Sequence, residues 1–121
     1  MARILLVEDD ADVRVVFEHI LLDDGHDVDA TATVLGGDDL LRRSDYDLLV
    51  SDGRLPDGTG MTLADKAREK GIPSLIVTGY AFNLRDSDCV DLSAYNVLLK
   101  PMRPAELLGA IARLLRGENL L

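Results

Sequence analysis

Four polar stretches, each directly after a short apolar run, contain the side chains that could do chemistry. They are Glu8-Asp9-Asp10, Asp52, Thr78-Gly79 and Lys100-Pro101. Carboxylates in close quarters repel one another, and a divalent cation offsets that repulsion. A site built only from oxygen ligands suits Mg²⁺, which takes octahedral geometry and keeps several waters. If the stretches meet in the fold, the sequence predicts a magnesium site beside a hydroxyl and an ammonium group.

Taken singly, each stretch has an ordinary structural explanation. Asp10 or Asp12 could cap a helix, and Asp52 could simply end a strand before a turn. Lys100 could be a solvated surface charge. Taken together, a carboxylate, a cation site, a hydroxyl and an ammonium group are the parts needed for phosphoryl transfer to a carboxylate. The carboxylate attacks phosphorus, while the metal, the hydroxyl and the ammonium group neutralise charge on the phosphoryl oxygens.

The elements that must position these side chains follow from the hydrophobic pattern. Short apolar or alternating runs predict strands at residues 4–7, 28–32, 48–50, 75–77 and 97–99. Apolar residues at helical spacing predict helices at residues 13–21, 38–43, 61–67 and 104–115. Between Thr78 and Tyr95 the apolar spacing is poor, so the fourth helix of the chain should be short or irregular. Residues 53–60 contain the turn signal Pro56-Asp57-Gly58.

Strands that alternate with helices at this spacing predict an α/β fold. We expect a doubly wound, five-stranded parallel sheet with helices on both faces, the flavodoxin-like arrangement. In the strand order 2-1-3-4-5 the first and third strands are neighbours, and ligands bind outside the carboxyl ends of the strands. Glu8, Asp9 and Asp52 should therefore converge at one edge of the sheet. Thr78 and Lys100 should lie at the same edge.

Composition sets outer limits on function. The chain has 121 residues, which predicts a single domain over residues 1–121. Its net charge of −9 argues against nucleic acid or a membrane as a direct partner, because phosphates attract clustered Lys and Arg. The single cysteine, Cys89, excludes an intramolecular disulfide and a Cys-rich zinc site. Since no apolar stretch reaches membrane-spanning length and no signal peptide is evident, we expect a cytoplasmic protein.

The chain resembles the receiver domain of two-component response regulators along essentially its whole length. The resemblance is carried by Ile4-Leu5-Leu6-Val7-Glu8-Asp9, Asp52-Gly53-Arg54-Leu55-Pro56, Gly60, Thr78-Gly79 and Lys100-Pro101. It implies that Asp52 is the phosphoacceptor, phosphorylated by a histidine kinase or a phosphotransfer protein. The phosphorylated domain would signal through altered binding of a downstream partner, which the sequence does not identify. The start at Met1 favours a complete single-domain protein or an amino-terminal receiver.

The same resemblance implies a set of magnesium ligands. Asp9 would bind Mg²⁺ directly and Glu8 mostly through water. The backbone carbonyl of Arg54 would supply a further protein oxygen beside the carboxylate of Asp52. Asp10 lies one residue past the acidic pair, and we expect it to cap the following helix.

The resemblance further implies which groups hold the phosphoryl oxygens. Thr78 and Lys100 would make these contacts, and the bond from Lys100 to Pro101 would be a cis peptide. Arg54 and Tyr80 would flank the pocket, where large side chains could shield the phosphoryl group from water.

One position departs from the family pattern. Three residues before the lysine of the Lys-Pro pair the family usually has Tyr or Phe, and here that position is Val97. Thr78-Gly79-Tyr80 resembles the signature of the single-domain "FAT GUY" subfamily, which lacks the usual ring, although Ile76-Val77 replaces the Phe-Ala of that signature. Our hypothesis is that Tyr80 is a substitute switch or a partner contact. The alternative is that Tyr80 is only a loop aromatic.

Two other functions remain open. A pseudo-receiver would keep the fold but act through partner binding without phosphorylation. A phosphohydrolase with an aspartyl nucleophile is disfavoured, because such an enzyme needs a carboxylic acid two residues after the nucleophile and Arg54 stands there. His19 and His26 are expected at the surface, with no companion residues for a metal site.

Overall fold

The computed structural model describes residues 1–79 and 94–120. Its helices and strands are β1 (Arg3–Val7), α1 (Ala11–Asp23), β2 (Asp27–Thr31), α2 (Val34–Arg43), β3 (Leu48–Asp52), β4 (Arg54–Leu55), β5 (Gly58–Thr59), α3 (Gly60–Glu69), β6 (Ser74–Thr78), β7 (Val97–Leu99) and α4 (Pro104–Leu115). In the described part of the chain, no helix is both long enough and apolar enough to cross a membrane. The predictions for Tyr80 and for the fourth helix between Thr78 and Tyr95 fall on residues 80–93, which lie outside the described residues.

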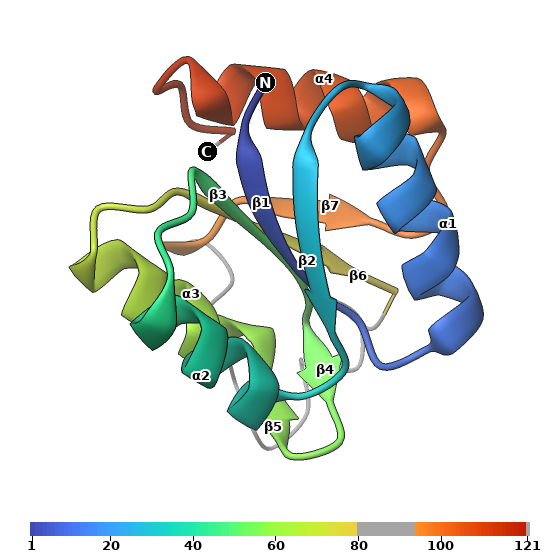
Figure 1. Ribbon diagram of the computed structural model, residues 1–121. Helices are drawn as coiled ribbons and strands as arrows, with labels where there is room; N and C mark the ends of the chain where they lie inside the picture. Colours follow the sequence, from blue (N-terminus) through green and yellow to red (C-terminus); the bar gives the residue numbers. More distant parts are fainter. Residues whose placement is uncertain (80–93, 121) are drawn as a thin grey trace.

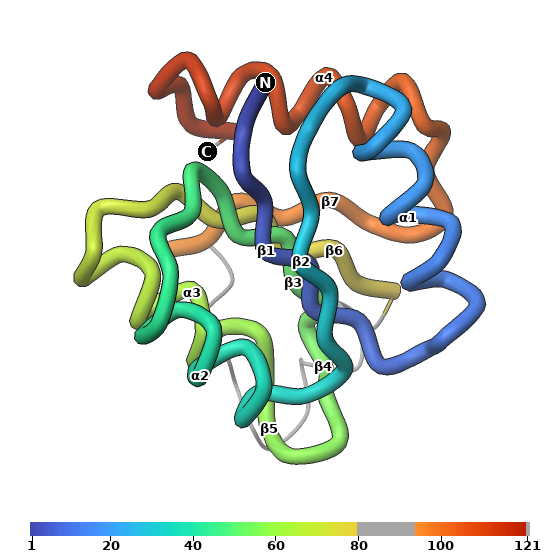
Figure 2. The backbone as a smooth tube through the Cα atoms, viewed as in Figure 1, coloured from blue at the N-terminus to red at the C-terminus, as the bar shows by residue number. Residues whose placement is uncertain are grey.

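The main sheet has five parallel strands in the order β2-β1-β3-β6-β7 (Figure 1). This is the predicted doubly wound arrangement. The fourth and fifth predicted strands are labelled β6 and β7, because β4 and β5 form a separate hairpin. The backbone trace in Figure 2 shows α1 and α4 on one side of the sheet and α2 and α3 on the other. The fold class predicted from the sequence is therefore confirmed.

Helices cover both faces of the sheet, and alternate residues of each strand point to opposite faces and pack in opposite layers. Ile4 and Leu6 of β1 pack in one cluster with α1 and α4, through residues such as Leu21 and Ile111. Leu5 and Val7 of the same strand pack on the other face with α2 and α3, and Leu41 and Leu63 belong to that cluster. A strand covered on both faces reads as a continuous apolar run, which is why β1, β3 and β6 were predictable.

The strand register brings the polar strand ends to one edge. Val7 of β1 lies beside Ser51, so Glu8 follows at the level of Asp52 at the end of β3. Thr78 of β6 pairs with Leu99 of β7, directly before Lys100.

Helix α2 begins at Val34, whereas the sequence pattern predicted a start near Asp38. Two glycines near the start of the helix obscure the helical pattern, yet close packing requires one of them. A methyl group at Gly37 would lie 2.8 Å from a side-chain carbon of Leu63 on α3. Thr33 caps the helix, since its side chain accepts a hydrogen bond from the N–H of Gly36 at 2.9 Å.

The prediction for His26 is wrong, whereas His19 is exposed as predicted. The His26 side chain is only 9% exposed, and its Nδ1 accepts a hydrogen bond from the backbone N–H of Ala2 at 3.0 Å. Its Nε2 lies 3.1 Å from the carboxylate of Asp24. The hydrogen bond from Ala2 connects the residue before β1 to the turn after α1. A contact between residues so far apart in the sequence could not be predicted from local hydrophobic patterns.

Candidate functional site

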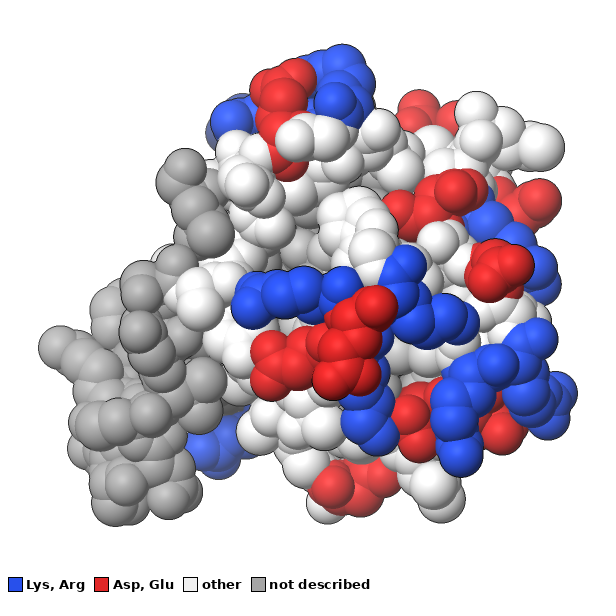
Figure 3. Space-filling view, turned by 90° about the vertical axis from the view of Figure 1, so that its left-hand side faces the viewer, with Lys and Arg blue, Asp and Glu red and all other residues white. Residues whose placement is uncertain are grey.

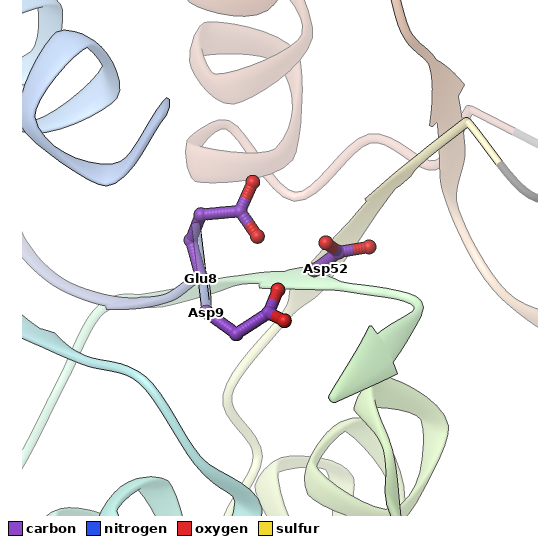
Figure 4. Close-up of side chains that lie close together, drawn as sticks. All are labelled: Glu8, Asp9 and Asp52. Atoms are coloured by element: carbon purple, nitrogen blue, oxygen red, sulfur yellow. The ribbon is translucent and has the colours of Figure 1, made fainter. Parts of the chain in front are cut away.

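Three carboxylates meet where β1 and β3 end. Glu8 and Asp9 follow β1, Asp52 is the last residue of β3, and one oxygen of each lies within 4.8 Å of the others. Figure 4 shows the three side chains facing a common space. Glu8 and Asp52 are buried, at 1% and 6% exposure, whereas Asp9 is exposed. The convergence predicted from the strand order is thus present in the structure.

Lys100 contributes a positive charge to this cluster from the end of β7. Its Nζ lies 2.5 Å from Glu8 Oε1 and 3.5 Å from Asp52 Oδ2. Burial alone lowers the pKa of Lys100, but the hydrogen bond to Glu8 and the Asp52 carboxylate raise that pKa by more. The side chain is therefore an ammonium ion in place to face negative charge on Asp52.

Thr78 occupies the end of β6 and is fully buried. Its backbone oxygen accepts a hydrogen bond from the N–H of Lys100 at 3.1 Å, so the two polar strand ends are tied together. Gly53 lies opposite, where a methyl group would sit 3.0 Å from the Thr78 hydroxyl oxygen. The bond from Lys100 to Pro101 is cis, as predicted.

The electrostatics of the cluster favour a bound cation. Burial and the neighbouring Asp52 carboxylate raise the pKa of Glu8 from 4.5 to about 7, against the opposing effect of the Lys100 ammonium. Glu8 Oε2 is buried and has no hydrogen-bond partner among the described residues. An oxygen-only donor set with one unsatisfied buried oxygen fits a hard divalent cation such as Mg²⁺.

The loop after Asp52 shapes the open side of the site. The backbone N–H of Arg54 donates to Asp52 Oδ1 at 3.3 Å, and the Arg54 side chain is exposed. A cleft at this edge is lined by the three carboxylates together with Arg54, Gly79 and Lys100. The sequence indicated this loop only as a turn, because a hairpin of two-residue strands leaves no alternating pattern.

Two further residues refine the sequence-based expectations. Asp10 is the N-cap of α1, since its Oδ1 accepts hydrogen bonds from the N–H groups of Asp12 and Val13 at 2.9 and 3.2 Å. Arg14, which sequence reasoning missed, donates from its guanidinium to the backbone oxygen of Glu8 at 2.8 Å. The position of a basic residue one helical turn after the acidic stretch could have indicated this contact in the sequence.

Val97, where the resemblance leads one to expect an aromatic ring, packs with Tyr95 against a small cluster that contains Met61, Ala64 and Ile76. The Tyr95 hydroxyl donates to Asp65 on α3 at 2.8 Å. The ring near the start of β7 is therefore attached to α3.

Comparison with known proteins gives consistent matches. A model described as "Response regulator receiver domain" matches residues 4–112. The probable transcriptional regulatory protein SilR of Salmonella typhimurium is 34% identical over 119 residues, covering 97% of this chain and 52% of SilR. The chain thus spans about half the length of the curated relatives it matches.

Solved structures agree with the sequence matches. A CheY-like response regulator receiver domain protein from Methanospirillum hungatei is 31% identical with a TM-score of 0.84, covering 97% of this chain and 95% of that one. The receiver domain of a sensor histidine kinase from Pseudomonas aeruginosa is 28% identical with a TM-score of 0.81, covering 95% and 98% of the two chains. That structure has a magnesium ion coordinated in its active-site cleft.

Proposed function

Because this chain belongs to the response regulator receiver domain family, we propose that it accepts a phosphoryl group on Asp52 and signals through altered partner binding. The donor would be a phosphohistidine of a histidine kinase or a phosphotransfer protein. The observation that carries the proposal is the position of Lys100. Its ammonium group faces the buried Asp52 carboxylate, beside a cluster of three carboxylates of the kind that holds a metal ion.

The chemistry assigned to Asp52 is a single displacement at phosphorus. A carboxylate oxygen of Asp52 forms a bond to phosphorus while the bond from phosphorus to the donor nitrogen breaks, and the imidazole leaves with its electron pair. Lys100 places positive charge 3.5 Å from Asp52 Oδ2, where negative phosphoryl oxygens would arrive. The buried hydroxyl of Thr78, at the adjacent strand end, is our second candidate contact for those oxygens.

Receiver domains bind Mg²⁺ at an acidic pocket, and this chain has such a pocket. We assign Glu8, Asp9, Asp52 and the backbone carbonyl of Arg54 to that ion. When bound, Mg²⁺ would neutralise charge that the phosphoryl oxygens bring to the carboxylates. Until then, the Lys100 ammonium offsets part of the repulsion between Glu8 and Asp52.

The proposal covers these 121 residues and not an output that a longer protein would add. Relatives such as SilR are named transcriptional regulators and are about twice as long as the matched region. Direct contact with nucleic acid remains disfavoured by the net charge of −9. On the face shown in Figure 3, basic and acidic side chains are intermixed. Ion pairs on α2 and α3 include Lys66 with Asp38 at 2.8 Å and Arg43 with Asp39 at 3.2 Å.

Intact mass measurement after incubation with acetyl phosphate and Mg²⁺ tests the proposal. We expect a Mg²⁺-dependent, base-labile phosphoryl adduct on the parent and none on Asp52→Asn. Asp45→Asn is the matched control, because Asp45 is an exposed acid near the opposite end of the same strand and should leave the adduct unchanged. A folded parent that gains no adduct and binds no beryllofluoride would instead support the pseudo-receiver.

A further inference from the structure

The loop that follows Asp52 is fastened to a helix from a different part of the chain. Asp57, in the turn between β4 and β5, accepts two backbone hydrogen bonds at the start of α2. The N–H of Val34 donates to Oδ1 at 2.8 Å and the N–H of Leu35 donates to Oδ2 at 2.9 Å. These two bonds, that from Leu35 foremost, lower the pKa of the Asp57 carboxyl. Asp57 is thus a second cap of α2, supplied from outside the helix.

The base of the hairpin is closed by a hydrogen bond from the N–H of Gly60 to the backbone oxygen of Gly53 at 3.1 Å. Strands β4 and β5 have two residues each, and an isolated hairpin is marginally stable even when longer. Two other contacts accompany the Asp57 bonds on the same side: Leu55 is buried in the cluster of α2 and α3, and Gly58 lies against Val34. At Gly58, whose φ is +154°, a methyl group would come within 3.3 Å of Val34 Cγ2.

The hairpin carries a group that touches the phosphoacceptor. Arg54 is the first residue of β4, three positions before Asp57, and its backbone N–H donates to Asp52 Oδ1 at 3.3 Å. Arg54 pairs with Thr59 across the hairpin. Since the strands are so short, we expect a displacement of the turn at Asp57 to displace the N–H group of Arg54 as well.

We propose that Asp57 is a positioning residue for the reaction at Asp52: by holding the β4–β5 hairpin on α2, it keeps the backbone of Arg54 against the acceptor carboxylate. The inference rests on the proposed function, because it specifies how the N–H group of Arg54 orients the Asp52 carboxylate for attack on phosphorus. Asp57 itself touches none of the reacting atoms and acts through Arg54.

The experiment compares Asp57→Ala with Thr33→Ala in the full chain. Both remove a side-chain cap from α2, but the Thr33 hydroxyl accepts its hydrogen bond from the N–H of Gly36, within its own segment. Two quantities are measured: the rate constant for phosphorylation by acetyl phosphate at saturating Mg²⁺, and the hydrogen-exchange protection of the Arg54 amide in metal-free protein. Asp57→Asn is the conservative variant, because its amide oxygen can still accept one of the two bonds.

We expect Asp57→Ala to lower the rate constant about fivefold, the worth of one ordinary hydrogen bond, and to reduce protection at Arg54. Asp57→Asn should fall between that variant and the parent. Thr33→Ala should destabilise α2 yet change neither readout.

Equal rates and equal Arg54 protection in the parent, Asp57→Ala and Asp57→Asn would overturn the inference, as would an equal loss in Thr33→Ala. A parent that is never phosphorylated refutes the proposed function instead, and the Arg54 amide then still tests the positioning. If Asp57→Ala does not fold, Asp57→Asn decides by the same two readouts.

Discussion

Lys100 Nζ and Glu8 Oε1 lie 2.5 Å apart although the two residues are 92 positions apart in the sequence. Lys100 follows β7 and Glu8 follows β1, and the sheet places β3 and β6 between those two strands. The lysine side chain therefore reaches across the carboxyl edge of the sheet and passes beside Asp52 on the way. One ammonium group thus faces two buried carboxylates and offsets part of their repulsion, and the exposed Asp9 adds a third carboxylate to the cluster.

Removal of this ammonium group should make the protein more dependent on Mg²⁺. In Lys100→Ala we expect the free energy of unfolding of the metal-free protein to fall by about 2 kcal/mol, because Glu8 is left buried without its partner. Mg²⁺ should then raise the melting temperature more in the variant than in the parent, since the acidic site is more negative. Thermal unfolding with and without Mg²⁺ measures both effects.

Lys66→Ala is the control for that comparison, because Lys66 pairs with the partly exposed Asp38 away from the site. Its response to Mg²⁺ should equal that of the parent. An equal Mg²⁺ response in Lys100→Ala would contradict the electrostatic account of the site.

Two glycine substitutions should have opposite effects on stability. A methyl group at Gly60 would overlap the backbone oxygen of Asp52 and lie 2.7 Å from Ser51 Oγ, so Gly60→Ala should cost about 1–3 kcal/mol through overpacking. Gly109, within α4, has open space around it, and Gly109→Ala should stabilise by about 0.5–1 kcal/mol. Urea denaturation measures both. Phosphorylation should decrease only in Gly60→Ala, and an unimpaired Gly60→Ala would show that α3 can move away from β3.

Substitutions of the neighbouring residues Asp10 and Asp9 should affect different properties, helix stability and Mg²⁺ binding respectively. Asp10→Ala should lower the free energy of unfolding by about 1 kcal/mol through loss of the α1 cap, while Asp10→Asn, which still accepts these bonds, should cost far less. Asp9→Asn should weaken Mg²⁺ binding, which a calorimetric titration detects, by more than Asp10→Asn does. The assignment of Asp10 as a cap fails if Asp10→Asn weakens Mg²⁺ binding as strongly.

Tyr46 should make stability depend on pH in the alkaline range. Burial, with a 2.7 Å hydrogen bond from its hydroxyl to Asp29, raises the pKa of Tyr46 to about 12, above the value of 10 expected when unfolded. A raised pKa contributes stability that is complete below pH 10 and is lost as the pH rises through 12. We expect this loss to be about 1–2 kcal/mol, less than the whole shift because solvent reaches Asp29.

Urea denaturation of the parent and Tyr46→Phe at pH 9 and pH 11.5 tests this expectation. The stability advantage of the parent over the variant should shrink at the higher pH. A constant difference between the two proteins would mean that the phenol titrates alike in the folded and unfolded chains.

Local patterns determined the architecture and the grouping of the site. Apolar runs such as Leu48–Val50 are buried on both faces of the sheet, so their period and length are visible without any tertiary information. A parallel sheet brings the carboxyl ends of its strands to one edge, which is why the convergence of Glu8, Asp9 and Asp52 was predictable. Their assignment to magnesium and phosphoryl chemistry stays a proposal.

Only the tertiary structure decided how the groups are connected. The start of α2 receives an additional cap from Asp57 in a later loop, and the part-buried ring of His26 accepts a hydrogen bond from the N–H of Ala2. Neither contact produces a periodic pattern in the sequence. A hydrogen bond between distant residues restricts the residue types at its two positions but not at the positions between them. The pairing of Lys100 with Glu8 is of the same kind. Strand order placed both at one edge, but the packing of the sheet brought them within hydrogen-bonding distance.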